Sequence, residues 1–233
     1  MNETSVLVAE DLHKRFPSGD RELTVLRGVN LEVRRGEILS IVGASGVGKS
    51  TLLHILGGLL RPTAGRVLLA GEDVFRLGDG ELSRRRNEKI GFVFQFHHLL
   101  PEFTAEENVM LPCMIGNGSR RSARERAQLL LGSVSLSDRA THHPSELSGG
   151  EQQRVAVARA LATSPDVVLA DEPSGNLDEK RSRELHDLIW SLREKEEQAF
   201  VIVTHDEELA NRADRKLRLH DGVLLEEPGG SAR

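Results

Sequence analysis

The sequence predicts an α/β protein whose mostly parallel β-sheet is covered by helices on both faces. Short apolar segments of strand length alternate with segments of helical periodicity, which is the order typical of such sheets. A glycine-rich turn joins one of these apolar segments to a helix. With 233 residues, 38% of them hydrophobic, the chain is long enough to bury one substantial core.

The first half of the chain contains the expected early strands and one helix. Residues 6–12 and 23–33 are rich in β-branched residues and predict β structure at the N-terminal end. Residues 37–43 form an apolar run that leads into the glycine-rich turn, and residues 49–60 predict the helix that follows. Two further short strands are expected at 66–70 and 90–94.

The pattern changes after Gln95 from strands to helices. We expect one domain over residues 1–233, in which a helical subdomain at 96–158 is inserted into a core formed by 1–95 and 159–233. Strand patterns return at 166–172 and 199–205. The two helical faces that support this reading comprise Ala123, Ala127, Leu130, Leu131 and Val134, and then Leu185, Leu188, Ile189 and Leu192.

Composition narrows the classes of function. A formal net charge of -5 disfavours a broad nucleic-acid-binding surface, so we expect no nucleic-acid partner. The single cysteine, Cys113, excludes an internal disulfide framework and lies in an apolar context typical of a buried residue. The N-terminal segment lacks the apolar run of a signal peptide. No run of about 18 apolar residues occurs, so we expect no direct membrane insertion.

The glycine-rich turn carries the first chemical motif. The segment GASGVGKST follows a strand and opens a helix, as a phosphate-binding loop requires. Glycines let backbone N–H groups surround phosphate oxygens, while Lys49 reaches the β- and γ-phosphates and Ser50 binds Mg²⁺. The expected nucleotide-binding residues are Gly43, Ala44, Ser45, Gly46, Val47, Gly48, Lys49, Ser50 and Thr51.

A second motif, DVVLADE, ends a buried strand with two acids. In NTPases with such a loop, an aspartate at this place, here Asp171, holds the Mg²⁺ shell through water. The next residue, Glu172, is placed to polarise an attacking water. Many strands end at acidic turns, so it is the pairing with the phosphate loop that favours catalysis.

A third motif, ELSGGEQQRVAVARAL, places Ser148, Gly149 and Gly150 at the start of a helix, where an anion can bind. A serine N-cap with flexible glycines would explain the serine but not the glycine pair. One chain with two anion sites either binds two phosphates or shares a nucleotide with a second copy of itself. With LSGGE, the series of motifs resembles that of the ATP-binding cassette (ABC) ATPases over nearly the whole chain.

The resemblance implies the ABC ATPase fold, with an N-terminal antiparallel β subdomain and an inserted helical subdomain. It also implies ATP and Mg²⁺ as cofactors and a head-to-tail homodimer in which Ser148, Gly149 and Gly150 contact the other chain's nucleotide. In matching positions, Gln95 would bind Mg²⁺ and sense the attacking water, and Asp178 would couple the two sites. His205 would contact the γ-phosphate and orient the water.

Phe16 stands near the position where the family usually stacks a tyrosine on adenine, although this chain contains no tyrosine. Its ring face keeps the capacity to stack. Core packing is the alternative role for this side chain.

The segment FQFHHLLPEFTAEENV, which begins at Phe94, fits none of these motifs. Adjacent side chains on an extended segment point apart, which disfavours a metal site at the histidine pair. Core packing explains part of the leucines and Phe103 but not two histidines and a proline. Apolar anchors among polar groups indicate a docking surface. The candidate docking residues are His97, His98, Leu99, Leu100 and Phe103.

The amino-acid sequence of this segment resembles that of the ATPases of lipoprotein-releasing transporters of Gram-negative bacteria, and so do the segments PSELSGGEQQRVAVARAL and LADEPSGNLD. The resemblance implies transmembrane permease subunits as partners and a peripheral location on the cytoplasmic side of the inner membrane. Related alternatives are the ATPases of macrolide-efflux and cell-division complexes. A soluble ABC ATPase acting on nucleic acid, or a scaffold that uses ATP only to switch binding, are alternatives of other classes.

Overall fold

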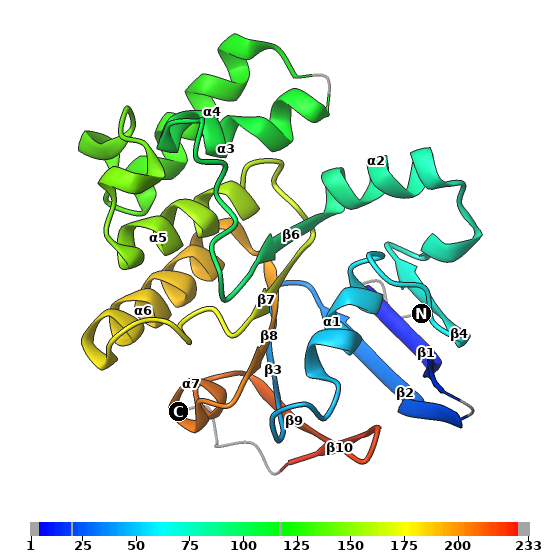
Figure 1. The fold of residues 1–233 in the computed structure, drawn as a ribbon. Coiled ribbons are helices and arrows are strands. Elements are labelled where there is room, and N and C mark those ends of the chain that lie inside the picture. Colours follow the sequence, from blue (N-terminus) through cyan, green and yellow to red (C-terminus); the bar gives the residue numbers. More distant parts are fainter. Residues whose placement is uncertain (1–4, 20, 117, 228–233) are drawn as a thin grey trace.

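The computed structural model describes residues 5–19, 21–116 and 118–227, and it contains two β-sheets (Figure 1). The smaller sheet has the strand order β2-β1-β4-β5, and every pairing in it is antiparallel. Its strands are β1 (Ser5–Ser18), β2 (Arg21–Arg34), β4 (Ala64–Leu69) and β5 (Glu72–Asp73). The expected antiparallel β region is therefore present. Its strands β1 and β2 are longer than the apolar segments, 6–12 and 23–33, from which they were predicted.

The larger sheet has the order β10-β9-β3-β8-β7-β6. All neighbours are parallel except the pair β10 and β9, which confirms the prediction of a mostly parallel sheet. The six strands are β3 (Ile38–Val42), β6 (Ile90–Val93), β7 (Val167–Asp171), β8 (Ala199–Thr204), β9 (Arg215–His220) and β10 (Val223–Glu226).

Alternation along the buried strands divides the core into two clusters. On β7, Val168 and Ala170 pack into the cluster formed with α3, α4, α5 and α6. Val167 and Leu169 face the opposite way and pack into the cluster formed with α1 and the small sheet. Side chains of a strand point alternately to the two faces, so an unbroken apolar run needs a cover on each side.

Helices surround the larger sheet, and α3 and α4 lie away from the sheet of β1 and β2 (Figure 1). Within the described residues, no helix is both long and apolar enough to span a bilayer. The helices are α1 (Lys49–Leu56), α2 (Asp79–Lys89), α3 (Ala105–Ile115), α4 (Arg120–Ser133), α5 (Gly149–Ala160), α6 (Glu179–Glu196) and α7 (Glu207–Asn211). Short 3₁₀ turns lie at Val74–Arg76, Ser137–Arg139 and Pro144–Glu146.

Candidate nucleotide-binding and catalytic site

The loop between β3 and α1 has the backbone of an anion site. Gly46 and Gly48 have φ angles of 77° and 109°, in the left-handed region that only glycine enters without strain. A Cβ on Gly48 would lie 2.5 Å from Val25 Cγ1, so the close approach of β2 also requires glycine there. The N-cap residue of α1 is Gly48, which has no side chain to cap the helix, and this leaves the first amides of α1 available to an anion.

Lys49 is the buried cation of this loop. Its Nζ donates to the carbonyl oxygens of Gly43 at 2.8 Å and Ala44 at 3.2 Å. These bonds bend the side chain back over the loop and keep its charge beside the helix N-terminus. A fixed positive charge and free amides together form a site for phosphate oxygens.

Asp171 ends β7 and Glu172 follows it directly, with an unusual backbone. Glu172 has a φ of 45°, and its N–H donates to Val203 O at 2.9 Å. Its carboxylate accepts hydrogen bonds from Thr204 Oγ1 at 3.1 Å and from the His205 N–H at 3.3 Å. The side chain of Glu172 is only 15% exposed and thus holds one orientation.

A cavity of about 390 Å³ brings most of the expected catalytic residues together. The phosphate loop forms one wall, and the acids and His205 form another. Its lining comprises Ser45, Gly46, Gly48, Lys49, Ser50, Thr51, Gln95, Asp171, Glu172 and His205. Gly43, Ala44 and Val47 lie in the same loop but do not line this cavity, and neither does Phe16.

The oxygen-bearing residues of this cavity fit Mg²⁺. The Ser50 hydroxyl, the Gln95 amide and the Asp171 carboxylate supply the hard ligands that this ion prefers. In the described part of the chain, no three His, Cys, Asp or Glu side chains converge as a metal cage. Such a sparse set suits an ion that is held jointly with phosphates and water.

Phe16 lies on β1, next to β2, the strand that approaches the phosphate loop at Gly48. It pairs with Leu23 of β2, two residues before the Val25 that contacts Gly48. The ammonium group of Lys14 lies 4.8 Å from the centre of its ring. The ring is half-buried rather than enclosed in the core.

Gln95 is joined to the turn that follows Asp171 and Glu172, through a residue that sequence reasoning missed. Asn176 donates to the Gln95 carbonyl at 2.9 Å, and its Oδ1 accepts from Gln95 Nε2 at 3.3 Å. The only sequence signal for this contact was the presence of Asn176 in the SGNLD segment with Asp178. Asp178 itself caps α6 by accepting from the Arg181 N–H at 3.0 Å.

The LSGGE segment forms a separate site. Ser148 caps α5 and shares a reciprocal capping box with Glu151. Hydrogen bonds from the Ser148 backbone and hydroxyl lower the pKa of Glu151 to about 2. Ser148 and Gly150 line a cavity of about 300 Å³ that also contains Arg154 and Arg181. Because this cavity shares no lining residue with the first, one chain does not unite the two sites.

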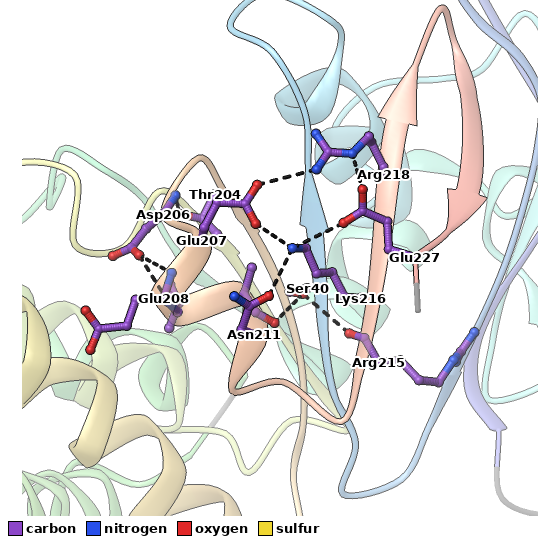
Figure 2. Close-up of polar contacts among 12 residues, drawn as sticks. Ser40, Thr204, Asp206, Glu207, Glu208, Asn211, Arg215, Lys216, Arg218 and Glu227 are labelled. Atoms are coloured by element: carbon purple, nitrogen blue, oxygen red, sulfur yellow. Dashed lines mark hydrogen bonds and ion pairs between the residues drawn. The ribbon is translucent and has the colours of Figure 1, made fainter. Parts of the chain in front are cut away.

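A short helix, α7, fixes the backbone directly after His205 (Figure 2). Asp206 accepts hydrogen bonds from the N–H groups of Glu208 at 2.8 Å and Leu209 at 3.1 Å. The helix is tied to β9, because Lys216 Nζ contacts Glu207 and also Asn211 Oδ1 at 3.0 Å.

The five residues expected for docking do not face one way. His98 lines a groove and its ring lies edge-on to Phe94, with 5.3 Å between ring centres. His97 is turned inward, where its Nδ1 is hydrogen-bonded to the buried Gln153. Leu99 packs against the helical core, whereas Leu100 is exposed and Phe103 is half-buried.

The groove beside His98 has a volume of about 480 Å³. It is mostly apolar and includes Ile115, which is 70% exposed. Phe96, 67% exposed, stands beside the same loop. Sequence reasoning missed both, because neither a helix end such as Ile115 nor a loop residue such as Phe96 carries a local signal that its apolar side chain is exposed. The groove also contains Leu59, Phe92, Phe94, Pro112 and Arg159.

Comparisons with known proteins agree with this geometry. Residues 26–175 match the family model described as ABC transporter. The chain is 57% identical over 222 residues to the lipoprotein-releasing system ATP-binding protein LolD of Geobacter metallireducens, covering 95% of this chain and 99% of that one. It is 54% identical over 220 residues to LolD of Cytophaga hutchinsonii, covering 94% and 99%. A dimeric ATP-binding cassette solved in a post-hydrolysis state with ADP and Pi has a TM-score of 0.88 and 40% identity, covering 97% of this chain and 100% of its own.

Proposed function

The chain belongs to the ABC transporter family, and on that premise we propose that it hydrolyses ATP to drive lipoprotein release from a membrane. One observation carries the chemical part of this proposal. The Lys49 loop, built for phosphate, shares a cavity with the hydrogen-bonded acid Glu172 and with His205. The similarity to proteins named for lipoprotein release supports the transport part.

Nucleotide binding falls to the loop from Gly43 to Thr51. Backbone amides at the start of α1 surround phosphate oxygens, and Lys49 neutralises the charge of the β- and γ-phosphates. We assign stacking on the adenine to Phe16. Bound Mg²⁺ would be held by Ser50, Gln95 and, through water, Asp171, and it would neutralise charge on the phosphate oxygens.

Hydrolysis requires a base near the γ-phosphate. Glu172 polarises the attacking water, since its carboxylate is held by Thr204 and the backbone of His205 and cannot turn away. The side chain of His205 is exposed at the cavity, where it contacts the γ-phosphate and orients the water. Fixed groups of this kind lower the barrier because they need not reorganise during the reaction.

A second copy of the chain completes the site. Ser148, Gly149 and Gly150 lie at the N-terminus of α5, and Ser148 and Gly150 line a cavity away from the phosphate loop, so the three residues serve the nucleotide of the partner. Asp178 caps α6 and follows Leu177, which lines the Ser148 cavity, and we assign to it the coupling of the two sites. The solved dimeric cassettes of similar fold support a homodimer.

The groove beside His98 is the proposed contact with transmembrane permease subunits. It offers apolar anchors framed by polar groups, as docking sites do. We place the protein at the cytoplasmic side of the inner membrane through this contact. Of the docking set, His98 and Leu100 act at the surface, while His97, Leu99 and Phe103 support the loop. The helical subdomain at 96–158 would carry both this contact and Ser148, with 1–95 and 159–233 as the nucleotide-binding core.

Reconstitution tests the function. The chain is co-purified with its permease subunits, placed in proteoliposomes loaded with a lipoprotein, and supplied with MgATP. We expect ATP-dependent release of the lipoprotein, which the Glu172→Gln chain does not support. ATP turnover with no release of lipoprotein, but with release of another substrate such as a macrolide, would overturn the assigned cargo and leave the ATPase role intact.

A further inference from the structure

A buried histidine and serine connect α6 to the turn that follows the catalytic acids. His186 is 2% exposed, and its Nε2 lies 3.0 Å from Oγ of Ser174, which is 7% exposed. Neither side chain lines the nucleotide cavity or the Ser148 cavity. Burying polar side chains costs free energy unless they are hydrogen-bonded, so a buried polar pair of this kind is expected to hold the backbone segments that carry it in place.

Ser174 belongs to a tight turn that begins at Glu172. The Gly175 N–H donates to Glu172 O at 3.0 Å, and the Leu177 N–H donates to Ser174 O at 3.0 Å. Asn176, which lies in the same turn, donates a hydrogen bond to the Gln95 carbonyl. The turn is thus anchored on one side to Gln95, just after β6, and on the other side to α6 through His186.

Burial and neighbouring charges both act on the pKa of His186. Burial lowers the pKa of His186, and Arg212 lowers it further, whereas Asp206, Glu208 and Asp187 raise it. Asp206 is already engaged in capping α7 (Figure 2). The hydrogen bond of His186 is thus directed to the turn after Glu172, while the charge of Asp206, just after His205, acts on its pKa.

We propose that His186 is a positioning residue for ATP hydrolysis, which holds the turn from Glu172 to Asp178 through its bond to Ser174. The inference rests on the proposed role of Glu172 as the base. The turn carries Glu172 at its start and the residues that couple the two sites at its end. Loosening the turn misplaces the base and leaves the phosphate loop, on the other side of the cavity, unchanged.

The test compares steady-state kinetics of full-length variants. His186→Phe keeps a ring but removes the hydrogen bond, and Ser174→Ala removes the other partner with little change in volume. We expect each to lower kcat about 2- to 10-fold, as the loss of one hydrogen bond does, with KM for MgATP unchanged. The double variant should be no slower than the slower single variant, because both remove the same bond.

Conservative variants separate positioning from general stability. Ser174→Thr keeps the hydroxyl, and His186→Gln keeps a donor and an acceptor, so both should retain more of kcat than the variants without the bond. A lowered melting temperature with unchanged kcat in Ser174→Ala would overturn the inference. So would additive effects in the double variant.

Glu172→Gln is measured in parallel. If it hydrolyses ATP normally, the proposed function of Glu172 fails together with the inference. If it is inactive while His186→Phe and Ser174→Ala turn over like the wild type, only the role of His186 fails.

Discussion

The Glu172 carboxylate lies 2.9 Å from Nδ1 of His205, although the two residues belong to different strand ends. They meet because β7 and β8 are parallel neighbours, so their carboxyl ends share one edge of the sheet. The histidine is 71% exposed and the acid 15%, so the pair presents one fixed and one accessible group.

Glu172→Gln should abolish most hydrolysis without weakening nucleotide binding. Removing a general base costs about 10²–10⁴ in rate, while the phosphate loop is untouched. ATP-bound dimers should therefore accumulate, as size-exclusion chromatography with MgATP would detect. Glu125→Gln on α4 is the matched control and should be fully active. Hydrolysis near the wild-type rate in Glu172→Gln would exclude this residue as the base.

Lys49→Ala should act on binding itself. The substitution removes the cation that neutralises the β- and γ-phosphates, so the affinity for ATP should fall at least tenfold. Titration with a fluorescent ATP analogue measures the change. Unaltered affinity would mean that the loop amides suffice without the lysine.

Ser148 should act on the nucleotide of the other chain. Lys49→Ala and Ser148→Arg chains are each expected to be inactive alone. Mixed in equal amounts, they form dimers in which one composite site keeps both residues intact. We expect partial ATPase activity in the mixture, and two differently tagged chains verify that mixed dimers form. Mixed dimers without activity would count against the shared site.

Substitutions in the groove beside His98 should weaken permease binding without affecting ATP hydrolysis. We expect the variant with His98→Asn and Ile115→Ala to hydrolyse ATP alone but to bind permease subunits about 30-fold more weakly, the result of losing about 2 kcal/mol. Asparagine is chosen because residue 98 has a φ of 46°, which asparagine tolerates. Leu129→Ala removes an equally exposed side chain on α4 and serves as control. Co-purification at wild-type level would remove the groove from the interface.

The Lys216 network should stabilise the fold only within a pH window. Contacts with Lys216 and Arg218 lower the pKa values of Glu207 and Glu227, and the pKa of Lys216 is raised in return. The carboxylate contribution is present above about pH 4.3 and is lost as pH falls through the lowered values. The lysine contribution is present below about pH 10.4 and is lost as pH rises through the raised value.

Lys216→Met should therefore lower the melting temperature at pH 7 by about 2–4 °C, the equivalent of about 1 kcal/mol. The difference from the wild type should shrink below about pH 4. Lys180→Met, at an exposed position, should have no such effect. A difference that stays constant from pH 3 to pH 8 would point to lost packing rather than lost charge.

Local patterns predicted seven of the ten described strands and the phosphate loop, because buried strands and glycine turns leave signals within a few residues. They missed β5, β9 and β10, which are short or rich in charged residues. They did not predict α3 as a separate helix, since Pro112 lies inside it. Nor could they predict the bonds from Thr204 to Glu172 or from His186 to Ser174, which depend on how distant elements pack. The inward turn of His97 toward Gln153 and the left-handed backbone at His98 likewise carry no signal in the neighbouring residues.

Helix α5 is bound at both of its ends. Ser148 begins it, and near its other end Arg159 donates to the carbonyl oxygens of His98 at 2.6 Å and His97 at 2.8 Å. Its 12 residues span about 18 Å without a break. A straight helix of this length turns rotation into displacement: tilting α5 by about 10° at the loop of His97 and His98 would move Ser148 by about 3 Å, roughly the length of one hydrogen bond.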